Sequence, residues 1–239
     1  MSARENAARV GAVCRVAIDG PAGAGKSTVA KAVASRLSAL YIDTGAMYRA
    51  VGLKMLAEGI GTGPEDAERL AHMLAETEID FADGRICLDG RDVSGDIRTD
   101  AISRMASECS ALPSVRQKLV ALQRAMGERR SVLMDGRDIG SNVFPDAEFK
   151  FFLTASPQER AHRRFLELQK RDENVSLARV LEDIEQRDYN DSHRALHPLV
   201  KTADAYEIDS TNMSAEEVTE RVLAVILGAR TAEAERGKR

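Results

Sequence analysis

The chain has 239 residues, which is long enough for one substantial hydrophobic core or for two small domains. Hydrophobic residues make up 44% of it and charged residues 30%, as in ordinary soluble globular proteins, and no apolar run is long enough to span a bilayer. The formal net charge of −4 argues against a protein that binds nucleic acid through its overall charge. Local clusters of arginine must therefore carry any recognition of phosphate.

The three cysteines are scattered, and the four histidines share no metal-ligand spacing with them. The sequence therefore predicts neither a disulfide framework nor a zinc site. Residues 1–12 are polar and alanine-rich and lack the apolar core of a signal peptide, which predicts a cytoplasmic protein with a disordered N-terminus. The charged residues 229–239 predict a frayed C-terminal tail.

Residues 20–27 match the phosphate-binding pattern G-x-x-x-x-G-K-[ST] at every fixed position. A short apolar run at 14–18 predicts a buried strand before this loop, and an Ala- and Val-rich run at 28–37 predicts a helix after it. Lys26 can reach the β- and γ-phosphates of a nucleoside triphosphate, and the Ser27 hydroxyl can bind Mg²⁺. The alternative is a glycine-rich turn with a solvated lysine. The triphosphate-binding residues that we expect are Gly20, Pro21, Ala22, Gly23, Ala24, Gly25, Lys26, Ser27 and Thr28.

A second predicted strand at 40–42 is followed by a predicted helix from Ala46 to about Glu58. Parallel strands present ligand groups at their carboxyl ends. Asp43, Thr44 and Arg49 are therefore expected near a second substrate. The alternatives are that Thr44 caps this helix, a role compatible with ligand binding, and that Arg49 is a solvated helix arginine.

The middle of the chain has a different character. Residues 64–75 predict a short helix, and the runs 78–81 and 85–88 flank Ala-Asp-Gly, which predicts an antiparallel hairpin. A further turn follows at 89–92, and residues 102–126 predict helical structure broken near Pro113, with Ser107 and Arg116 on it. An antiparallel element between parallel units predicts an inserted subdomain.

The run 131–138 is apolar and then ends in acids, as does the second phosphate-site strand of many P-loop proteins. Runs at 149–153 and 206–209 predict two more strands. Alternating strands and helices around a phosphate-binding loop predict an α/β fold, a doubly wound parallel sheet of about five strands. Right-handed crossovers then place the motifs at one edge of the sheet.

Two predicted helices carry charged faces. Ser156 to Glu159 form a capping box with proline at the first helical position, and Arg160, Arg163 and Arg164 share one face of the helix that follows. Such a face is either solvated or a lid that closes over phosphates. A helix at about 176–188 leads to Arg187, Asp191 and Arg194, which share a face if helical spacing continues. A capping box at Ser214 and Glu217 starts an amphipathic helix to about Leu227.

Five stretches are characteristic in combination: Asp-Gly-Pro-Ala-Gly-Ala-Gly-Lys at 19–26, Asp-Thr-Gly-Ala-Met-Tyr-Arg at 43–49, Asp-Val-Ser-Gly-Asp-Ile-Arg at 92–98, Asp-Gly-Arg-Asp-Ile-Gly at 135–140 and Glu-Arg-Ala-His-Arg-Arg at 159–164. Together they resemble the bacterial cytidylate (CMP/dCMP) kinases. The resemblance implies an ATP- and Mg²⁺-dependent kinase of CMP and dCMP. It implies a kinase domain over 13–228, an insertion that binds the nucleoside monophosphate at about 45–115 and a short lid at about 157–175.

The resemblance also implies roles for individual residues. Arg49 and Arg137 would hold the CMP phosphate, with Thr44 nearby. Ser107, Arg116, Asp138 and Arg194 would contact cytosine, and Arg187 and Asp191 the sugar. The lid arginines Arg160 and Arg164 would face the transferring phosphoryl group and assist Lys26 in catalysis. Compared with some relatives, residues 188–193 contain fewer basic side chains, which leaves open the loss of a phosphate contact.

Elementary chemistry is consistent with these roles. The second pKa of a phosphate monoester is about 6, so the acceptor is mostly a dianion at neutral pH and needs no general base. Cytosine offers a hydrogen-bond donor at N4 where uracil offers an acceptor at O4, so a carboxylate at position 138 favours CMP over UMP. The alternative for Asp138 is a structural partner of a neighbouring arginine.

Three other functions remain to be weighed. They are a P-loop kinase for AMP or shikimate, a GTP-dependent switch, and a nucleotide-binding module without catalysis. The motifs after the phosphate-binding loop argue against the first, and the absence of an N-K-x-D sequence argues against the second. Intact Lys26 and Ser27 argue against the third. We expect ATP and CMP or dCMP as partners, no nucleic acid, no membrane and a monomer.

Overall fold

The structure is a computed structural model that describes residues 14–82, 84–128, 130–170 and 175–236. The expected disordered N-terminus and residues 237–239 of the expected tail lie outside the described residues. The chain divides into two compact units, one formed by 1–41, 130–193 and 197–239 and the other by 42–129 and 194–196. The expected insertion at 45–115 falls inside the second unit.

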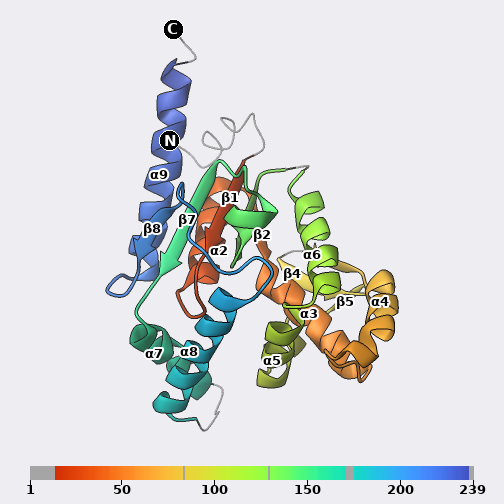
Figure 1. Ribbon diagram of the computed structural model, residues 1–239. Coiled ribbons are helices and arrows are strands. Elements are labelled where there is room, and N and C mark those ends of the chain that lie inside the picture. The colour runs from red at the N-terminus through yellow and green to blue at the C-terminus, as the bar shows by residue number, and fades with distance from the viewer. Residues whose placement is uncertain (1–13, 83, 129, 171–174, 237–239) are drawn as a thin grey trace. The chain divides into compact units, whose positions relative to one another are not determined.

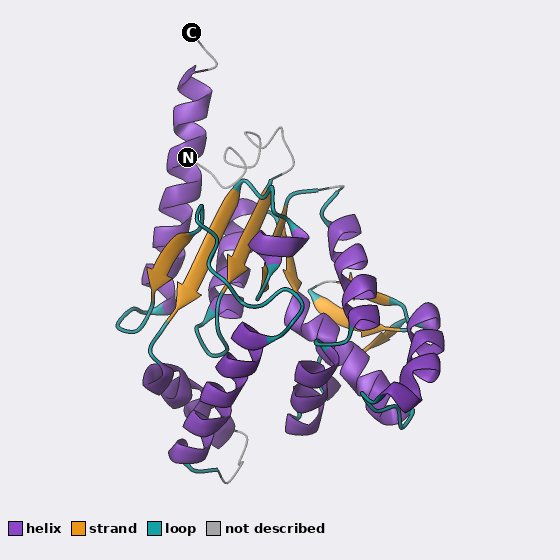
Figure 2. Ribbon diagram, viewed as in Figure 1, coloured by secondary structure: helices purple, strands orange, loops and turns teal. Residues whose placement is uncertain are grey.

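The first unit is built on a sheet of five strands in the order β2-β6-β1-β7-β8. The strands are β1 (Arg15–Asp19), β2 (Leu40–Asp43), β6 (Val132–Gly136), β7 (Phe149–Thr154) and β8 (Tyr206–Asp209). β1 pairs in parallel with β6 and β7, and β7 pairs in parallel with β8 (Figure 2). The sheet confirms the predicted doubly wound α/β fold, and its order places β1, which leads into the phosphate-binding loop, in the middle.

Helices α2 (Lys26–Leu37) and α9 (Ala215–Arg236) pack against one another and share a core with the sheet (Figure 1). Val33 of α2 and Ile226 of α9 are fully buried in this core, as is Leu133 of β6. The capping box at the start of α9 is confirmed, because Glu217 N donates to Ser214 Oγ at 3.2 Å and Ser214 N donates to Glu217 Oε2 at 2.8 Å.

The end of α9 was predicted too early. The helix continues past Leu227 to Arg236 and so includes most of the expected frayed tail. Residues 229–236 are mainly Ala, Arg and Glu, which are strong helix formers, and no proline interrupts them. In the described part of the chain, no helix is long and apolar enough to cross a membrane.

Helices α7 (Pro157–Gln169) and α8 (Leu177–His193) lie side by side in the first unit (Figure 1). They share a small core of Ala161, Leu168, Val180 and Ile184. Residues 171–174 of the expected lid lie outside the described residues.

The start of α7 and the end of α8 differ in detail from the predictions. The capping box of α7 is only half formed, since Ser156 Oγ accepts from Glu159 N at 3.2 Å but the Glu159 carboxylate binds Arg163. Helix α8 continues past the predicted end near Asp188 to His193, so it carries both Arg187 and Asp191. Beyond it the chain turns back, and Leu199 N donates to the Asp191 carbonyl at 2.8 Å. Arg194 therefore lies outside α8 and does not continue its face.

The second unit combines helices with a three-stranded antiparallel sheet in the order β3-β4-β5. The strands are β3 (Ile79–Ala82), β4 (Arg85–Leu88) and β5 (Arg91–Asp92), which confirms the hairpin, although Asp83 of its turn lies outside the described residues. The helices are α3 (Thr44–Ala57), α4 (Ala67–Glu76), α5 (Asp100–Cys109) and α6 (Pro113–Met126), with 3-10 turns at Pro64–Asp66 and Asp96–Arg98.

The start of α3 corrects one alternative. Asp43, not Thr44, is the capping residue, and its Oδ1 accepts from Ala46 N at 2.9 Å. Aspartate is as good a capping residue as serine and better than threonine, and it occupies the position before the first helical residue. Thr44 is thus the first residue of α3 and is buried. The predicted break at Pro113 is confirmed, since proline opens α6.

Candidate active site

The phosphate-binding loop joins β1 to α2, and its shape depends on glycine. Gly20 has φ +147°, and a Cβ there would lie 2.0 Å from the Leu153 carbonyl oxygen of the neighbouring strand. Gly25 caps α2 in the left-handed region with φ 86°, without a side chain to satisfy the first N–H groups of the helix. Such an open helix N-terminus binds anions. Helix α2 begins at Lys26, two residues before the predicted start.

Lys26 is buried at the start of α2, with 6% of its surface exposed. Its Nζ donates to the Pro21 carbonyl at 2.7 Å. Burial, together with the positive charge of Arg137, lowers the pKa of the Lys26 ammonium, while Asp135 and Asp191 oppose this effect. A bound triphosphate adds negative charge, which stabilises the charged form of this lysine.

Ser27 and Asp135 meet where α2 begins and β6 ends. Ser27 Oγ donates to Asp135 Oδ2 at 2.8 Å, and Tyr41 Oη donates to Asp135 Oδ1 at 2.8 Å. This confirms that the acid at the end of β6 lies beside the phosphate-binding loop. Hydroxyl and carboxylate oxygens are the ligands that Mg²⁺ prefers, so these residues fit that ion.

After β6 the chain makes a π-helical turn, Ile139–Val143, which is anchored by Asp19 at the end of β1. Asp19 Oδ1 accepts from Ile139 N at 2.8 Å, and Asp19 Oδ2 accepts from Gly140 N at 2.7 Å. Burial raises the pKa of this carboxyl to about 6, against the lowering effect of the two amides. Asp138, directly before the turn, is buried, and its Oδ2 accepts from Asn142 Nδ2 at 3.0 Å.

Arg137 is fixed by α8. Its Nε donates to Asp191 Oδ2 at 2.6 Å, and its Nη1 donates to the Gly136 carbonyl at 3.2 Å. Burial opposes the charge of this guanidinium, but the hydrogen bond and attraction to Asp191, together with attraction to Asp135 and Asp188, raise the pKa of Arg137. Arg187 also lies on α8, one turn before Asp191, and is half-buried. The structure thus places Arg137, Arg187 and Asp191 around the buried Lys26, whose pKa all three affect.

Two of the three arginines of α7, Arg160 and Arg164, differ in their surroundings. Arg160 is buried, and its guanidinium contacts the Ala155 and Ala22 carbonyls at 2.8 and 3.2 Å and Asp188 Oδ2 at 2.7 Å. Arg164 is half-buried, with Nη1 3.4 Å from Glu167 Oε2. The face is therefore not a uniformly solvated one, because Arg160 directly contacts the phosphate-binding loop.

The remaining expected acceptor residues belong to the second unit. Thr44 and Arg49 lie on α3, Ser107 on α5 and Arg116 on α6, and α3 packs against both other helices. Arg116 is buried, with its guanidinium carbon 6.0 Å from the Tyr48 ring centroid. Arg194 lies in the short stretch 194–196.

Sequence reasoning gave no separate role to three residues that organise the site. They are Asp19, which anchors the turn after Asp138; Asp188, which binds Arg160; and Ser210, which contacts the Ala24 carbonyl. A signal existed for Asp19, since an acid directly before a phosphate-binding glycine opposes anion binding unless it is paired elsewhere. The other two rest on contacts between distant parts of the chain.

A five-stranded parallel sheet with a phosphate-binding loop, a buried lysine and a serine–aspartate pair defines a P-loop nucleotide-binding protein. A family model described as cytidylate kinase matches residues 16–227, which is most of the chain. The chain therefore belongs to the cytidylate kinase family.

Curated relatives agree over nearly their whole length. A cytidylate kinase of Clostridioides difficile is 49% identical over 88% of this chain and 97% of its own. One of Caldanaerobacter subterraneus is 51% identical over 89% of this chain and 94% of its own. A solved structure of an uncharacterized protein from Eubacterium ventriosum covers 89% of this chain and 98% of its own with a TM-score of 0.51, but at 12% identity it shows the fold alone.

Proposed function

We propose that the chain transfers the γ-phosphoryl group of ATP, with Mg²⁺, to CMP and dCMP. One observation carries the proposal most directly: the buried Lys26 and the Ser27–Asp135 pair lie beside Arg137 and Asp138 at the carboxyl end of β6, in a chain of the cytidylate kinase family. A donor site and candidate acceptor groups thus belong to adjacent strands of one sheet.

On the donor side, residues 20–28 hold the triphosphate. The backbone N–H groups of the loop and the N-terminus of α2 bind phosphate oxygens, and Lys26 neutralises the β- and γ-phosphates. Ser27 holds Mg²⁺, with Asp135 as its hydrogen-bonded neighbour. When bound, the ion withdraws charge from the phosphoryl oxygens.

On the acceptor side, each role follows the resemblance. Arg49 and Arg137 hold the phosphate of CMP beside Thr44. Ser107, Arg116, Asp138 and Arg194 contact the base, and Arg187 and Asp191 the sugar. Arginine suits the phosphate roles because its planar fork binds two oxygens and stays charged. The contact of Arg137 with Asp191 favours this assignment, since it brings together the side chains expected to bind the phosphate and the sugar of CMP.

The transfer needs alignment and charge stabilisation rather than a base. The acceptor phosphate is already a dianion at neutral pH, so no residue has to remove a proton. Lys26, Arg160 and Arg164 then stabilise the charge on the moving phosphoryl group. Arg160 reaches that group only by exchanging one of its present contacts with Ala22, Ala155 or Asp188.

The test is an ADP-release assay with ATP and Mg²⁺ that compares CMP, dCMP, UMP, AMP and no acceptor. We expect turnover with CMP and dCMP, weak turnover with UMP and negligible turnover with AMP, and loss of all turnover in Lys26→Met. ADP release without an acceptor would contradict the proposal and indicate an NTPase. No release with any acceptor would remove the CMP assignment.

We also propose that the enzyme acts as a monomer in the cytoplasm. The donor site of Lys26, Ser27 and Asp135 is complete within one chain, so it needs no second copy. Light scattering coupled to size-exclusion chromatography should give one species near the chain mass of 26.1 kDa, with or without nucleotide. A species of twice that mass would contradict the monomer.

A further inference from the structure

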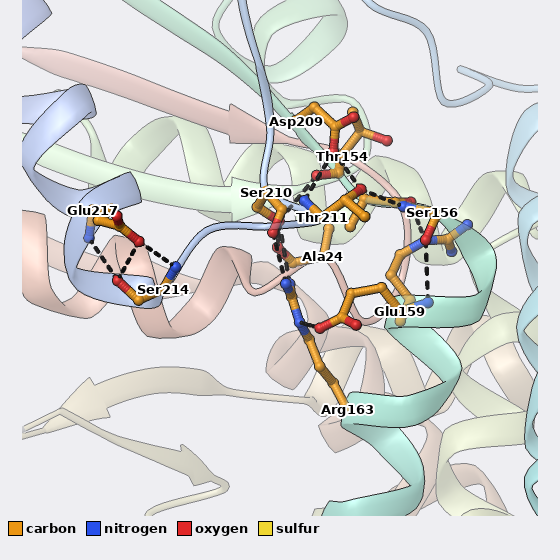
Figure 3. Close-up of polar contacts among 12 residues, drawn as sticks. Ala24, Thr154, Ser156, Glu159, Arg163, Asp209, Ser210, Thr211, Ser214 and Glu217 are labelled. Carbon is orange, nitrogen blue, oxygen red and sulfur yellow. Dashed lines mark hydrogen bonds and ion pairs between the residues drawn. The ribbon is translucent and has the colours of Figure 1, made fainter.

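Ser210, directly after β8, connects three segments that are distant in sequence (Figure 3). It is buried, with 2% of its surface exposed. Its N–H donates to the Thr154 carbonyl at 2.8 Å, and its Oγ lies 3.0 Å from that oxygen and 3.3 Å from the Ala24 carbonyl oxygen. Because the Thr154 carbonyl already accepts from the Ser210 amide, the Ser210 hydroxyl can donate to the Ala24 carbonyl of the phosphate-binding loop.

Arg163 of α7 holds Ser210 from the other side (Figure 3). Its Nη1 donates to Ser210 Oγ at 3.2 Å, and its Nη2 donates to the Ser210 carbonyl at 2.7 Å. Its Nε donates to Glu159 Oε1 at 2.8 Å, so the guanidinium itself is oriented by its own helix. Because Arg163 donates to the hydroxyl oxygen, the Ser210 hydrogen points away from Arg163, toward the Thr154 and Ala24 carbonyls.

The direction of the Ala24 carbonyl has a consequence for the loop. In a planar trans peptide the C=O and the following N–H point in opposite directions. A Ser210 hydroxyl that holds the Ala24 carbonyl outward therefore holds the Gly25 N–H on the opposite side of the peptide. Arg160 acts in the same way on the Ala22 carbonyl and so on the Gly23 N–H.

Helix α7 can act on the loop because it approaches closely. Gly23 has φ +76°, and a Cβ there would lie 3.0 Å from Arg160 Cβ and 3.2 Å from the Arg160 carbonyl oxygen. The first two turns of α7 thus rest directly on the phosphate-binding loop.

We propose that Ser210 and Arg163 are positioning residues for the donor nucleotide, which orient the Gly25 N–H of the phosphate-binding loop before ATP binds. The inference rests on the proposed use of ATP as donor, but it does not require CMP as acceptor. Preorganised N–H groups bind phosphate more tightly because no orientational freedom is lost on binding.

Ser210→Ala tests the inference, with Ser214→Ala as the matched control. Ser214 lies in the same loop, but its side chain bonds Glu217 and caps α9 rather than contacting the phosphate-binding loop (Figure 3). Calorimetric titration with Mg²⁺-ADP and steady-state assays are run on both. We expect Ser210→Ala to weaken ADP binding and raise KM for ATP about 5- to 20-fold, with KM for CMP within twofold. Ser214→Ala should lower the melting temperature and leave ADP affinity unchanged.

Substitution of Arg163 tests the same network and leaves the buried serine intact. The Arg163 side chain is itself 27% exposed. Arg163→Met should weaken ADP binding as Ser210→Ala does, and Arg163→Lys, which keeps charge but not the fork, should restore part of the affinity. The double variant Ser210→Ala/Arg163→Met should bind ADP about as well as the weaker single variant, since both remove one network.

Equal loss of ADP affinity in Ser210→Ala and Ser214→Ala would overturn the inference, because it would indicate a general effect on folding. Unchanged ADP affinity in Ser210→Ala and Arg163→Met would overturn it as well. ADP titration does not depend on the acceptor. A chain that fails to phosphorylate CMP but shows the expected shift would therefore refute the proposed function and still support this inference.

Discussion

Arg137 Nε donates to Asp191 Oδ2 at 2.6 Å, so two residues that the family resemblance assigns to the phosphate and the sugar of one acceptor bind each other directly. Their side chains are 18% and 10% exposed. The contact fixes the direction of the Arg137 side chain. A change at Asp191 therefore acts on Arg137 as well as on the expected sugar contact.

Asp191→Asn should therefore affect both stability and acceptor binding. The amide keeps the shape of the carboxylate but removes the hydrogen-bonded charge of a largely buried guanidinium, at a cost of about 1.5–3 kcal/mol in the free energy of unfolding. We expect KM for CMP to rise at least tenfold. Urea unfolding and steady-state kinetics measure the two effects.

Asp146→Asn is the control, because Asp146 pairs with Arg15 at 2.8 Å in the same unit but is 65% exposed. An exposed pair contributes about 0–1 kcal/mol, so this variant should match the wild type in stability and kinetics. If Asp191→Asn behaved like the control, the pair would have no role in holding Arg137.

Asp138→Asn separates the two interpretations of that residue. A carboxylate accepts from N4 of cytosine, whereas an amide can also donate to O4 of uracil. We expect kcat/KM for CMP to fall about 10- to 100-fold, in line with about 1–3 kcal/mol for a base contact, while UMP is unchanged or improved. A parallel loss with both nucleotides would instead indicate a structural partner, such as that of Asn142, whose Nδ2 lies 3.0 Å away.

The sequence was sufficient for the elements and for the donor loop because local signals determine them. Proline predicted the start of α6, and the Ala-Asp-Gly sequence predicted the hairpin of β3 and β4. The glycines and Lys26 identified the phosphate-binding loop. Element ends were less well predicted. Helix α9 continued through strong helix formers, and α8 ran past its predicted end near Asp188 to His193, one residue before Arg194.

The partners of the site side chains were not accessible in the same way. Arg137 and Asp191 are 54 positions apart, and Ser210 and Ala24 are 186 apart. Such contacts depend on which strands become neighbours and on how helices pack, not on local spacing. Arg160 illustrates this, since its spacing with Arg163 and Arg164 gave a shared face but not its burial against the phosphate-binding loop.

Asp19 should give stability a measurable pH dependence. Burial raises the pKa of its carboxyl from 3.8 to about 6 in the folded protein. Between these values the folded state binds more protons than the unfolded state, so this group's contribution to stability is full below about pH 4 and is lost as the pH rises through 6. The loss amounts to about 3 kcal/mol at 1.4 kcal/mol per pKa unit.

Other carboxylates also titrate at low pH. The wild type is therefore compared with Asp19→Asn, whose amide does not titrate. The difference in unfolding free energy, wild type minus variant, should fall between pH 4 and pH 7 in urea titrations. A difference that stays constant or grows with pH would contradict the raised pKa. Asparagine also presents a donor to one of the two amides, so the variant should be less stable than the wild type at the acid end.

Gly23→Ala should be more harmful than an equivalent change at Gly90. The two glycines have nearly the same backbone angle, φ +76° and +79°, so alanine meets the same strain of about 1–2 kcal/mol at each. At Gly90 a Cβ has nothing within 4 Å, whereas at Gly23 it would lie 3.0 Å from Arg160 Cβ and 3.2 Å from the Arg160 carbonyl oxygen. Only the substitution at Gly23 forces α7 and the phosphate-binding loop apart.

We therefore expect Gly90→Ala to lower the melting temperature modestly and to leave kinetics unchanged. Gly23→Ala should lower it by more and also raise KM for ATP at least tenfold, because the loop that binds the triphosphate has to shift. Thermal denaturation and ATP titration of both variants measure this. Equal effects at the two positions would mean that the close approach of α7 does not shape the donor site, since the backbone strain is matched and only the contact with Arg160 differs.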